Sequence, residues 1–177
     1  MAGPRLIIVC GVPGSGKSTL AHHAVQNWGA VSFASETFAA ELGAAGRDAT
    51  GDLTRHAIDH AYAGMGVAVA AALAERKLVL AVGSFRSGEQ RQRFRDIAKG
   101  AAAPATTLHV VCAAPTAAHR VRERMAHGER GPNETSIRQI EDVLKRATDF
   151  DVVLTNEGSI EDFLRRADVM LKSLSKM

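Results

Sequence analysis

The sequence predicts a three-layer α/β domain in which helices cover both faces of a parallel sheet. Short apolar runs of strand length alternate along the chain with longer segments that carry apolar residues at helical spacing. Residues 6–10 (Leu-Ile-Ile-Val-Cys) are apolar throughout and end at a glycine, which is typical of a strand buried on both faces. The alternation implies right-handed crossovers between parallel strands.

The first half of the chain is expected to hold three strands and three helices. The strands are expected at residues 6–10, 30–34 and 78–82, and the first two helices at 18–27 and 36–42. A long third helix is expected after residues 50–52 and up to about Arg76, because apolar residues recur there at helical spacing. Gly64 and Gly66 weaken the middle of this helix.

The second half continues the same alternation. Helices are expected at residues 89–99, 115–127 and 135–147, strands at 107–112 and 151–155, and a loop at 128–133. Residues 159–162 (Ser-Ile-Glu-Asp) resemble a capping box and are expected to start the last helix.

Length and composition indicate one compact domain over residues 1–177. Apolar residues make up 46% of the chain and charged residues 23%, and no repeat or proline-rich linker divides it. The chain runs from Met1 directly into its first strand, and no apolar run approaches the roughly 18 residues of a membrane span. We therefore expect a cytoplasmic protein without a membrane partner, either a monomer or a homodimer.

Two cysteines and a small positive charge restrict the function classes only weakly. Cys10 and Cys112 lie in expected buried strands and lack the spacing of metal ligands, so we expect free thiols in the core. The net charge of +3 does not by itself indicate nucleic acid. The histidines show no coherent ligand spacing with carboxylates, and we expect no metal site built from the protein alone.

The most specific motif follows the first expected strand and opens the first helix. It reads Gly11-Val12-Pro13-Gly14-Ser15-Gly16-Lys17-Ser18-Thr19, with the spacing G-x-x-x-x-G-K-S. Its small residues can wrap a polyphosphate with backbone N–H groups, and the N-terminus of the helix adds a partial positive charge. Lys17 would reach the β- and γ-phosphates, and Ser18 would coordinate Mg²⁺. All nine residues are predicted to bind ATP with Mg²⁺.

Three further segments extend this motif to a family resemblance. They are Ser35-Glu36-Thr37-Phe38, Gly83-Ser84-Phe85-Arg86-Ser87 and Asn156-Glu157-Gly158-Ser159, which follow the second, third and fifth strands. With them the chain resembles the P-loop kinases of the nucleoside monophosphate kinase type, including the archaeal dephospho-CoA kinase-like and phage deoxynucleotide kinase-like members. The resemblance covers nearly the whole chain, and it implies the P-loop NTPase fold with strand order 2-3-1-4-5.

The resemblance also implies where ligands bind. Such kinases hold the phosphoryl acceptor between the second and third strands and adenine near the loop after the fifth. A mobile lid that carries arginines, here about residues 120–135, covers the phosphates. Catalysis then consists mainly of alignment and charge neutralisation.

Glu36 and Arg86 are the main candidates for the acceptor site. Glu36 occupies the place of an acid that could orient or deprotonate an acceptor hydroxyl, or hold a metal-bound water. Arg86 follows the third strand at the carboxyl edge of the sheet, where its guanidinium could bind a phosphate. The alternatives are a solvated carboxylate in the first turn of a helix and a surface ion pair.

Other arginines are assigned by their helical positions. Arg120 and Arg124 share one helix face, whereas Arg122 points elsewhere and is expected in solvent. Because the resembling kinases use arginines here for the base stack and for the transferring phosphoryl group, the resemblance implies these roles for Arg120, Arg124 and Arg130. Arg47 and Arg55 flank a segment that would close over the acceptor, with a solvated helix face as the alternative. We expect Arg91, Arg93 and Arg95 to be solvated, because they alternate by two along a helix.

Asn156 and Gly158 are candidates for the adenine pocket, because their turn follows the fifth strand at the same edge of the sheet. A plain turn before a capped helix explains them almost as well.

One acid usual in the resembling kinases is missing. They carry an Asp at the end of the third strand that orients the water shell of Mg²⁺, and here the aligned place holds Val82 or Gly83. Mg²⁺ would then rely on Ser18, on the nucleotide phosphates and on water held by Glu36 or Glu89.

Three functions are consistent with these patterns. The first is transfer of the γ-phosphoryl group of ATP to a small acceptor, with a nucleotide or nucleotide-like metabolite first in line. The second is a 5′-hydroxyl polynucleotide kinase, which would make nucleic acid the partner. The third is an ATP-binding regulatory protein of weak activity that has lost the acid of the third strand.

Overall fold

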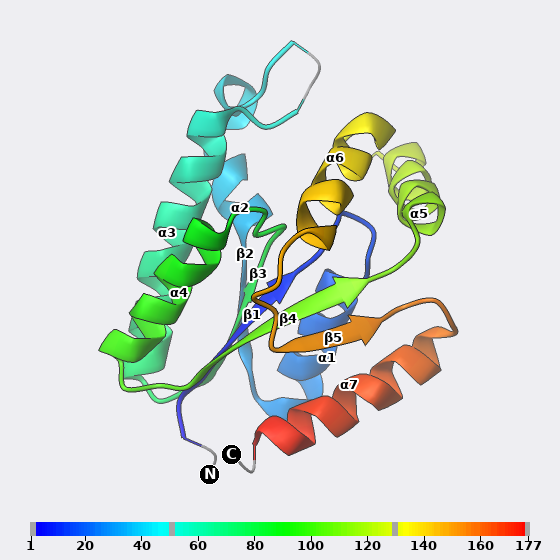
Figure 1. Ribbon diagram of the computed structural model, residues 1–177. Coiled ribbons are helices and arrows are strands. Elements are labelled where there is room, and N and C mark those ends of the chain that lie inside the picture. The colour runs from blue at the N-terminus through cyan, green and yellow to red at the C-terminus, as the bar shows by residue number, and fades with distance from the viewer. Residues whose placement is uncertain (1–2, 50–51, 129–130, 176–177) are drawn as a thin grey trace.

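A five-stranded parallel sheet forms the centre of the protein. The computed structural model describes residues 3–49, 52–128 and 131–175. The strands are β1 (Arg5–Cys10), β2 (Val31–Ala34), β3 (Leu78–Val82), β4 (Ala105–Val111) and β5 (Val152–Thr155). They pair in parallel in the order β2-β3-β1-β4-β5, which confirms the predicted fold class and strand order (Figure 1).

Helices cover both faces of this sheet (Figure 1). They are α1 (Lys17–Trp28), α2 (Ser35–Ala40), α3 (Arg55–Ala74), α4 (Gly88–Gly100), α5 (Ala114–Ala126), α6 (Glu134–Lys145) and α7 (Ile160–Leu174), with a 3-10 helix η1 at Gly43–Gly46. Side chains alternate along β1, so that Ile7 and Val9 belong to the core under α1 and α7. Leu6 and Ile8 belong to the core under α3 and α4.

A third apolar cluster lies beyond the carboxyl ends of the strands. Val12 and Cys112 pack there against buried residues of α5 and α6, among them Val121 and Ile140. Figure 1 shows these two helices side by side past the tips of β1 and β4. The segment predicted as the lid, residues 120–135, covers the second half of α5, the connection and the start of α6.

The segment between β2 and α3 differs most from the expectation. The helix predicted to reach residue 42 ends at Ala40, and η1 follows it. Helix α3 begins at Arg55, where the hydroxyl of Thr54 accepts a hydrogen bond from the N–H of Ala57. Residues 47–49 and 52–54 form what we call the flap, which an isolated antiparallel bridge between Arg47 and Leu53 closes.

Helix α3 tolerates its glycines because they allow close packing. A Cβ at Gly64 would lie 2.9 Å from the ring of Phe38, and one at Gly66 would lie 3.1 Å from Ile97. Within the described residues, α3 is also the one helix long and apolar enough to span a membrane. Its buried side chains, among them Met65, Val69 and Leu73, belong to the core under α3 and α4, as in the core helix of a globular domain.

Both cysteines are buried free thiols, as predicted. Burial in the strand raises the pKa of Cys10 to about 12, which leaves its thiol protonated and unreactive.

Three aromatic rings join α3, α4 and the turn after β3. Phe85 is fully buried between Tyr62 and Phe94, with ring centroids 4.9 and 5.0 Å away and edge-to-face geometry. The N–H of Phe85 donates a hydrogen bond of 2.8 Å to the hydroxyl of Tyr62. The cluster therefore fixes the turn that carries Ser84 and Arg86.

We expect Phe94→Ala to lower the free energy of unfolding by about 3–5 kcal/mol, because it leaves a cavity beside two packed rings. Urea denaturation followed by circular dichroism measures this change. Arg93→Ala, at an exposed position of the same helix, is the matched control and should stay within about 0.5 kcal/mol. Equal losses for both variants would contradict the role given to the cluster.

Candidate active site

The phosphate loop lies between β1 and α1, and its glycines are required by packing as well as by backbone angles. Gly14 and Gly16 adopt φ values of 85° and 104°. A Cβ at Gly14 would overlap the carbonyl oxygen of Ala117 in α5, and one at Gly16 would overlap the amide of Asn156. Neighbouring segments thus hold the loop in a shape that side chains would disrupt.

Lys17 is nearly buried at the start of α1. Its Nζ donates a hydrogen bond of 2.8 Å to the carbonyl oxygen of Val12 in the same loop. Desolvation lowers the pKa of this ammonium to about 8, and the nearby carboxylate of Glu36 partly opposes that shift. A polyphosphate would supply the negative charge that this buried ammonium lacks.

The turn after β5 supports the loop from the other side. Asn156 is buried, and its side-chain N–H donates 2.8 Å to the carbonyl oxygen of Ser15. The structure therefore gives Asn156 a contact with the phosphate loop, while its predicted contact with adenine stays a prediction. Gly158 follows it on the same turn.

The first cavity, of about 620 Å³, opens over this loop. Its lining includes most of the predicted nucleotide-binding residues: Pro13, Gly14, Gly16, Lys17, Ser18, Thr19, Arg120, Arg124, Asn156 and Gly158. Gly11, Val12 and Ser15 lie beneath it as buried parts of the loop. Arg120 Nη1 donates to the carbonyl oxygen of Gly14 at 3.2 Å, so α5 brings its guanidinium directly to the loop.

Arg122, a further arginine of the predicted lid, does not share the helix face of Arg120 and Arg124. Arg122 points away from the cavity and forms an ion pair of 3.3 Å with Glu134, with 62% of its side chain exposed. Arg130, predicted to act at the phosphates, lies outside the described residues. Glu123 and His127 also line the cavity, and no motif in the sequence indicated them.

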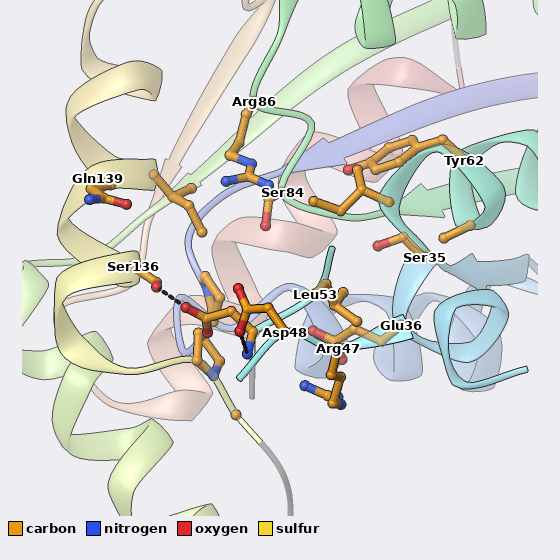
Figure 2. A pocket seen from close by; sticks show the side chains of 17 residues that line it. Ser35, Glu36, Arg47, Asp48, Leu53, Tyr62, Ser84, Arg86, Ser136 and Gln139 are labelled. Carbon is orange, nitrogen blue, oxygen red and sulfur yellow. Dashed lines mark hydrogen bonds between the residues drawn. The ribbon is translucent and has the colours of Figure 1, made fainter. Parts of the chain in front are cut away.

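The second cavity, of about 330 Å³, is the candidate acceptor site (Figure 2). Ser84 and Arg86 come from the turn after β3, and Ser35 and Tyr62 from α2 and α3. Ser136 and Gln139 face them from α6, and the flap supplies Arg47, Asp48 and Asp52. Figure 2 shows Arg86 beside Ser84, with Gln139 on one side of them and Tyr62 on the other.

Glu36 and Pro13 line both cavities. Glu36 lies in the first turn of α2, directly after β2, and its carboxylate is close enough to Lys17 to influence the pKa of the ammonium. The two cavities therefore meet at a carboxylate, with the phosphate loop on one side and a polar chamber on the other.

The flap is tied to α6 across the acceptor cavity. Asp52 Oδ2 accepts a hydrogen bond from Ser136 Oγ at 2.6 Å, which Figure 2 marks with a dashed line. It accepts a second one from Asn133 Nδ2 at 3.3 Å. Asn133 also caps α6, because its Oδ1 accepts from the N–H of Ser136 at 2.9 Å. We call these contacts the flap latch.

The two flanking arginines of the flap behave differently. Arg47 lines the second cavity, and its role in binding an acceptor stays a prediction. Arg55 does not line this cavity, because its side chain is 95% exposed and lies 3.9 Å from Asp59 on the outer face of α3. Arg55 therefore takes the alternative of a solvated helix face.

No acid takes the usual place at the end of β3. Val82 packs in the core under α1, and a Cβ at Gly83 would lie 2.7 Å from the hydroxyl of Tyr62 and 3.0 Å from that of Ser35. Two hydroxyl groups therefore occupy the space beside Gly83. Among the described residues, no group of three His, Cys, Asp or Glu side chains could hold a metal ion. Ser18, the predicted Mg²⁺ ligand, lines the first cavity.

The prediction that Arg91 and Arg95 are solvated is wrong. Their spacing of four places both on one face of α4, and both pair with Asp149, at 2.5 and 3.1 Å. Only 3% of the Arg91 side chain is exposed. Arg93, between them on the opposite face, is exposed as expected.

The loop, the parallel sheet and the two joined cavities define a nucleotide-binding protein with the P-loop kinase fold. The AAA domain family matches residues 6–149, and the chain belongs to this family. Among curated proteins, no match was found.

Solved structures share this fold at low sequence identity. A gluconokinase from Sinorhizobium meliloti 1021 is 20% identical with a TM-score of 0.73, and the match covers 99% of this chain and 96% of that one. A sugar kinase from Janibacter sp. HTCC2649 is 18% identical with a TM-score of 0.67, over 95% and 94% of the two chains. A chain of the Pnkp1/Rnl/Hen1 RNA repair complex is 17% identical with a TM-score of 0.68, over 82% of this chain and 45% of that one.

The depressed pKa of Lys17 predicts a pH dependence of ATP binding. Near pH 7 the ammonium is mostly protonated, whereas near pH 9 it is mostly neutral, since its pKa is about 8. Bound phosphate would raise this pKa, so ATP binding should take up close to one proton near pH 9. Calorimetry in buffers of different ionisation enthalpy measures the uptake.

Lys17→Met is the matched variant, because it keeps the length of the side chain without the titrating group. It should abolish the proton uptake and weaken ATP binding by at least about tenfold. Unchanged uptake in this variant would show that another group titrates.

Proposed function

We propose that the protein transfers the γ-phosphoryl group of ATP to a hydroxyl of a small acceptor. The observation that carries this proposal is the meeting of the two cavities at Glu36, between the phosphate loop and the chamber of polar side chains. Phosphoryl transfer needs donor and acceptor aligned across such a junction, with cations near the phosphates. Lys17, Arg120 and Arg124 supply the cations on the nucleotide side.

The residues of the loop would hold the donor. The backbone N–H groups of the loop and the N-terminus of α1 would bind the phosphates. The ammonium of Lys17 would exchange the carbonyl oxygen of Val12 for phosphate oxygens. Ser18 would hold Mg²⁺ together with the nucleotide, and this ion supplies neutralisation of the developing charge when bound.

Glu36 is proposed as the group that receives the acceptor proton. In this reaction the acceptor oxygen forms a bond to the γ-phosphorus, the bond to the bridging oxygen of ADP breaks, and the hydroxyl proton passes to Glu36. Among the described residues, Glu36 is the one carboxylate that lines both cavities. Arg120 and Arg124 would neutralise the phosphoryl oxygens from α5.

The lining of the second cavity supports a hydroxyl-rich acceptor over a nucleotide. Three carboxylates, from Glu36, Asp48 and Asp52, line it together with the guanidinium groups of Arg47 and Arg86. Carboxylates accept hydrogen bonds from hydroxyls and repel phosphate. The one aromatic ring in this lining is that of Tyr62, which is 7% exposed and offers little face for a base.

Two of the similar structures are named gluconokinase and sugar kinase, which supports an acceptor of this kind. We therefore place a sugar-like or polyol metabolite ahead of a nucleotide. Arg86 would bind an anionic group of such an acceptor if it carries one.

The polynucleotide kinase alternative rests on the similarity to a chain of an RNA repair complex. Against it stand the flap latch, which spans the acceptor cavity, and the three carboxylates of the lining. A strand of nucleic acid needs an open groove with basic walls. This function therefore stands second.

An ATP-binding regulatory protein is the remaining alternative, and the absence of an acid beside β3 supports it. It differs from the kinase in one measurable property, since ATP binding without acceptor-stimulated turnover is expected of a regulator.

We expect a panel of sugars, polyols, sugar acids, nucleotides and dephospho-CoA to contain an acceptor that stimulates ADP release, with a hydroxyl-rich compound the most effective. Glu36→Gln should then lower kcat by about a hundredfold or more while ATP affinity changes little, because the proton acceptor is lost. Steady-state kinetics and calorimetry measure the two effects. Glu41→Gln, a nearby exposed carboxylate outside both cavities, is the control. ATP binding without stimulation by any compound would favour the regulator.

We also expect short single-stranded oligonucleotides with a 5′-hydroxyl to bind weakly at low salt and to accept no phosphate. Fluorescence anisotropy and transfer of a labelled γ-phosphate measure these properties. Salt-sensitive binding together with end labelling would reverse the order of the two kinase functions.

A further inference from the structure

A buried arginine stands behind the acceptor cavity without lining it. Arg91 forms a fork with Asp149, with Nε donating to Oδ2 at 2.8 Å and Nη2 to Oδ1 at 2.5 Å. The guanidinium carbon lies 5.1 Å from the centre of the Phe150 ring. Arg95 adds a further bond to Asp149 and one of 2.8 Å to the hydroxyl of Thr107.

The remaining nitrogen of Arg91, Nη1, is directed at the turn after β3. Nη1 donates to the carbonyl oxygen of Phe85 at 2.6 Å and to that of Arg86 at 3.3 Å. Phe85 has a φ of 44°, an unfavourable backbone conformation for a bulky residue. Its N–H is held by Tyr62 and its carbonyl by Arg91, so the strained residue is fixed from both sides.

This conformation separates the side chains of the turn. Phe85 points into the core, whereas Ser84 and Arg86 on either side of it line the acceptor cavity. If the turn relaxed, both of these groups would move relative to Glu36. The hydrogen bonds of Arg91 therefore hold the backbone from which the Arg86 side chain extends.

Asp149 connects the same arginine to the opposite wall. It lies in the connection between α6 and β5, and α6 carries Ser136, Gln139 and Ile140 of the cavity lining. The hydrogen bonds from Arg91 lower the pKa of Asp149 to about 2, so the pair stays charged at any physiological pH. Arg91 thus joins the turn after β3 to the connection that follows α6.

We infer that Arg91, paired with Asp149, is a positioning residue that sets the spacing of the two acceptor walls and the orientation of Arg86. The inference rests on the proposed function of the second cavity as an acceptor site. A buried ion pair contributes little net stability compared with apolar packing of the same volume. The pair of Arg91 and Asp149 is therefore interpreted by the positions that it fixes. Here each nitrogen of the fork has a defined partner.

The test compares Arg91→Lys and Asp149→Asn with Asp168→Asn. Lysine keeps the charge but cannot hold Asp149 and the Phe85 carbonyl together. Asp168 is the control, because it accepts two comparable bonds, from His23 at 2.7 Å and Trp28 at 2.8 Å, between α1 and α7. Those helices cover the other face of the sheet.

Two readouts are measured on full-length protein. Hydrogen–deuterium exchange of the turn at residues 84–87 should accelerate by about tenfold in Arg91→Lys and Asp149→Asn, and not in Asp168→Asn. With the best acceptor of the panel, KM for the acceptor should rise by about tenfold in the first two variants, with ATP affinity unchanged in all three. Melting temperatures show how far each variant is destabilised.

The outcomes separate the inference from the proposed function. Faster exchange confined to the first two variants, with a selective rise in the acceptor KM, supports the inference. Unchanged exchange at residues 84–87, or equal effects in Asp168→Asn at equal loss of melting temperature, would overturn it. If no acceptor is found for the unmodified protein, the proposed function fails, and the exchange data still decide whether Arg91 orders the turn.

Discussion

The close packing of neighbouring segments against the phosphate loop is the constraint on which the rest of the structure depends. The carbonyl of Ala117 and the amide of Asn156 lie where side chains at Gly14 and Gly16 would be. These contacts bring α5 and the turn after β5 to the loop, and with α5 they bring Arg120 and Arg124. The arrangement of the first cavity follows from this contact between backbone segments.

Much of the fold could be predicted because its signals are local. The continuous apolar run of β1 and the glycine spacing of the loop each require one structure at one place. The carboxyl edge of the sheet predicts a ligand-binding place for Arg86, and the family resemblance predicts an acid at Glu36. The structure brings both to the second cavity, and their chemical roles remain to be tested.

The residues that sequence reasoning missed are those whose partners lie far along the chain. Asp52 meets Ser136, and Arg91 meets Asp149, and no local pattern marks either pair. The spacing of four between Arg91 and Arg95 was a usable signal, because it places two cations on one face that also carries buried Phe94 nearby. Asn133 offered a second signal, as a cap before α6, but nothing in the sequence linked it to the flap.

The hydroxyl of Tyr62 affects both the turn after β3 and the space beside Gly83. Its hydroxyl accepts the N–H of Phe85, and the same oxygen would lie 2.7 Å from any Cβ at position 83. An acid introduced at Gly83 would therefore meet the hydroxyl group that holds the neighbouring turn. A carboxylate placed at position 83 would therefore loosen the turn that carries Ser84 and Arg86, unless the side chain at position 62 were changed with it.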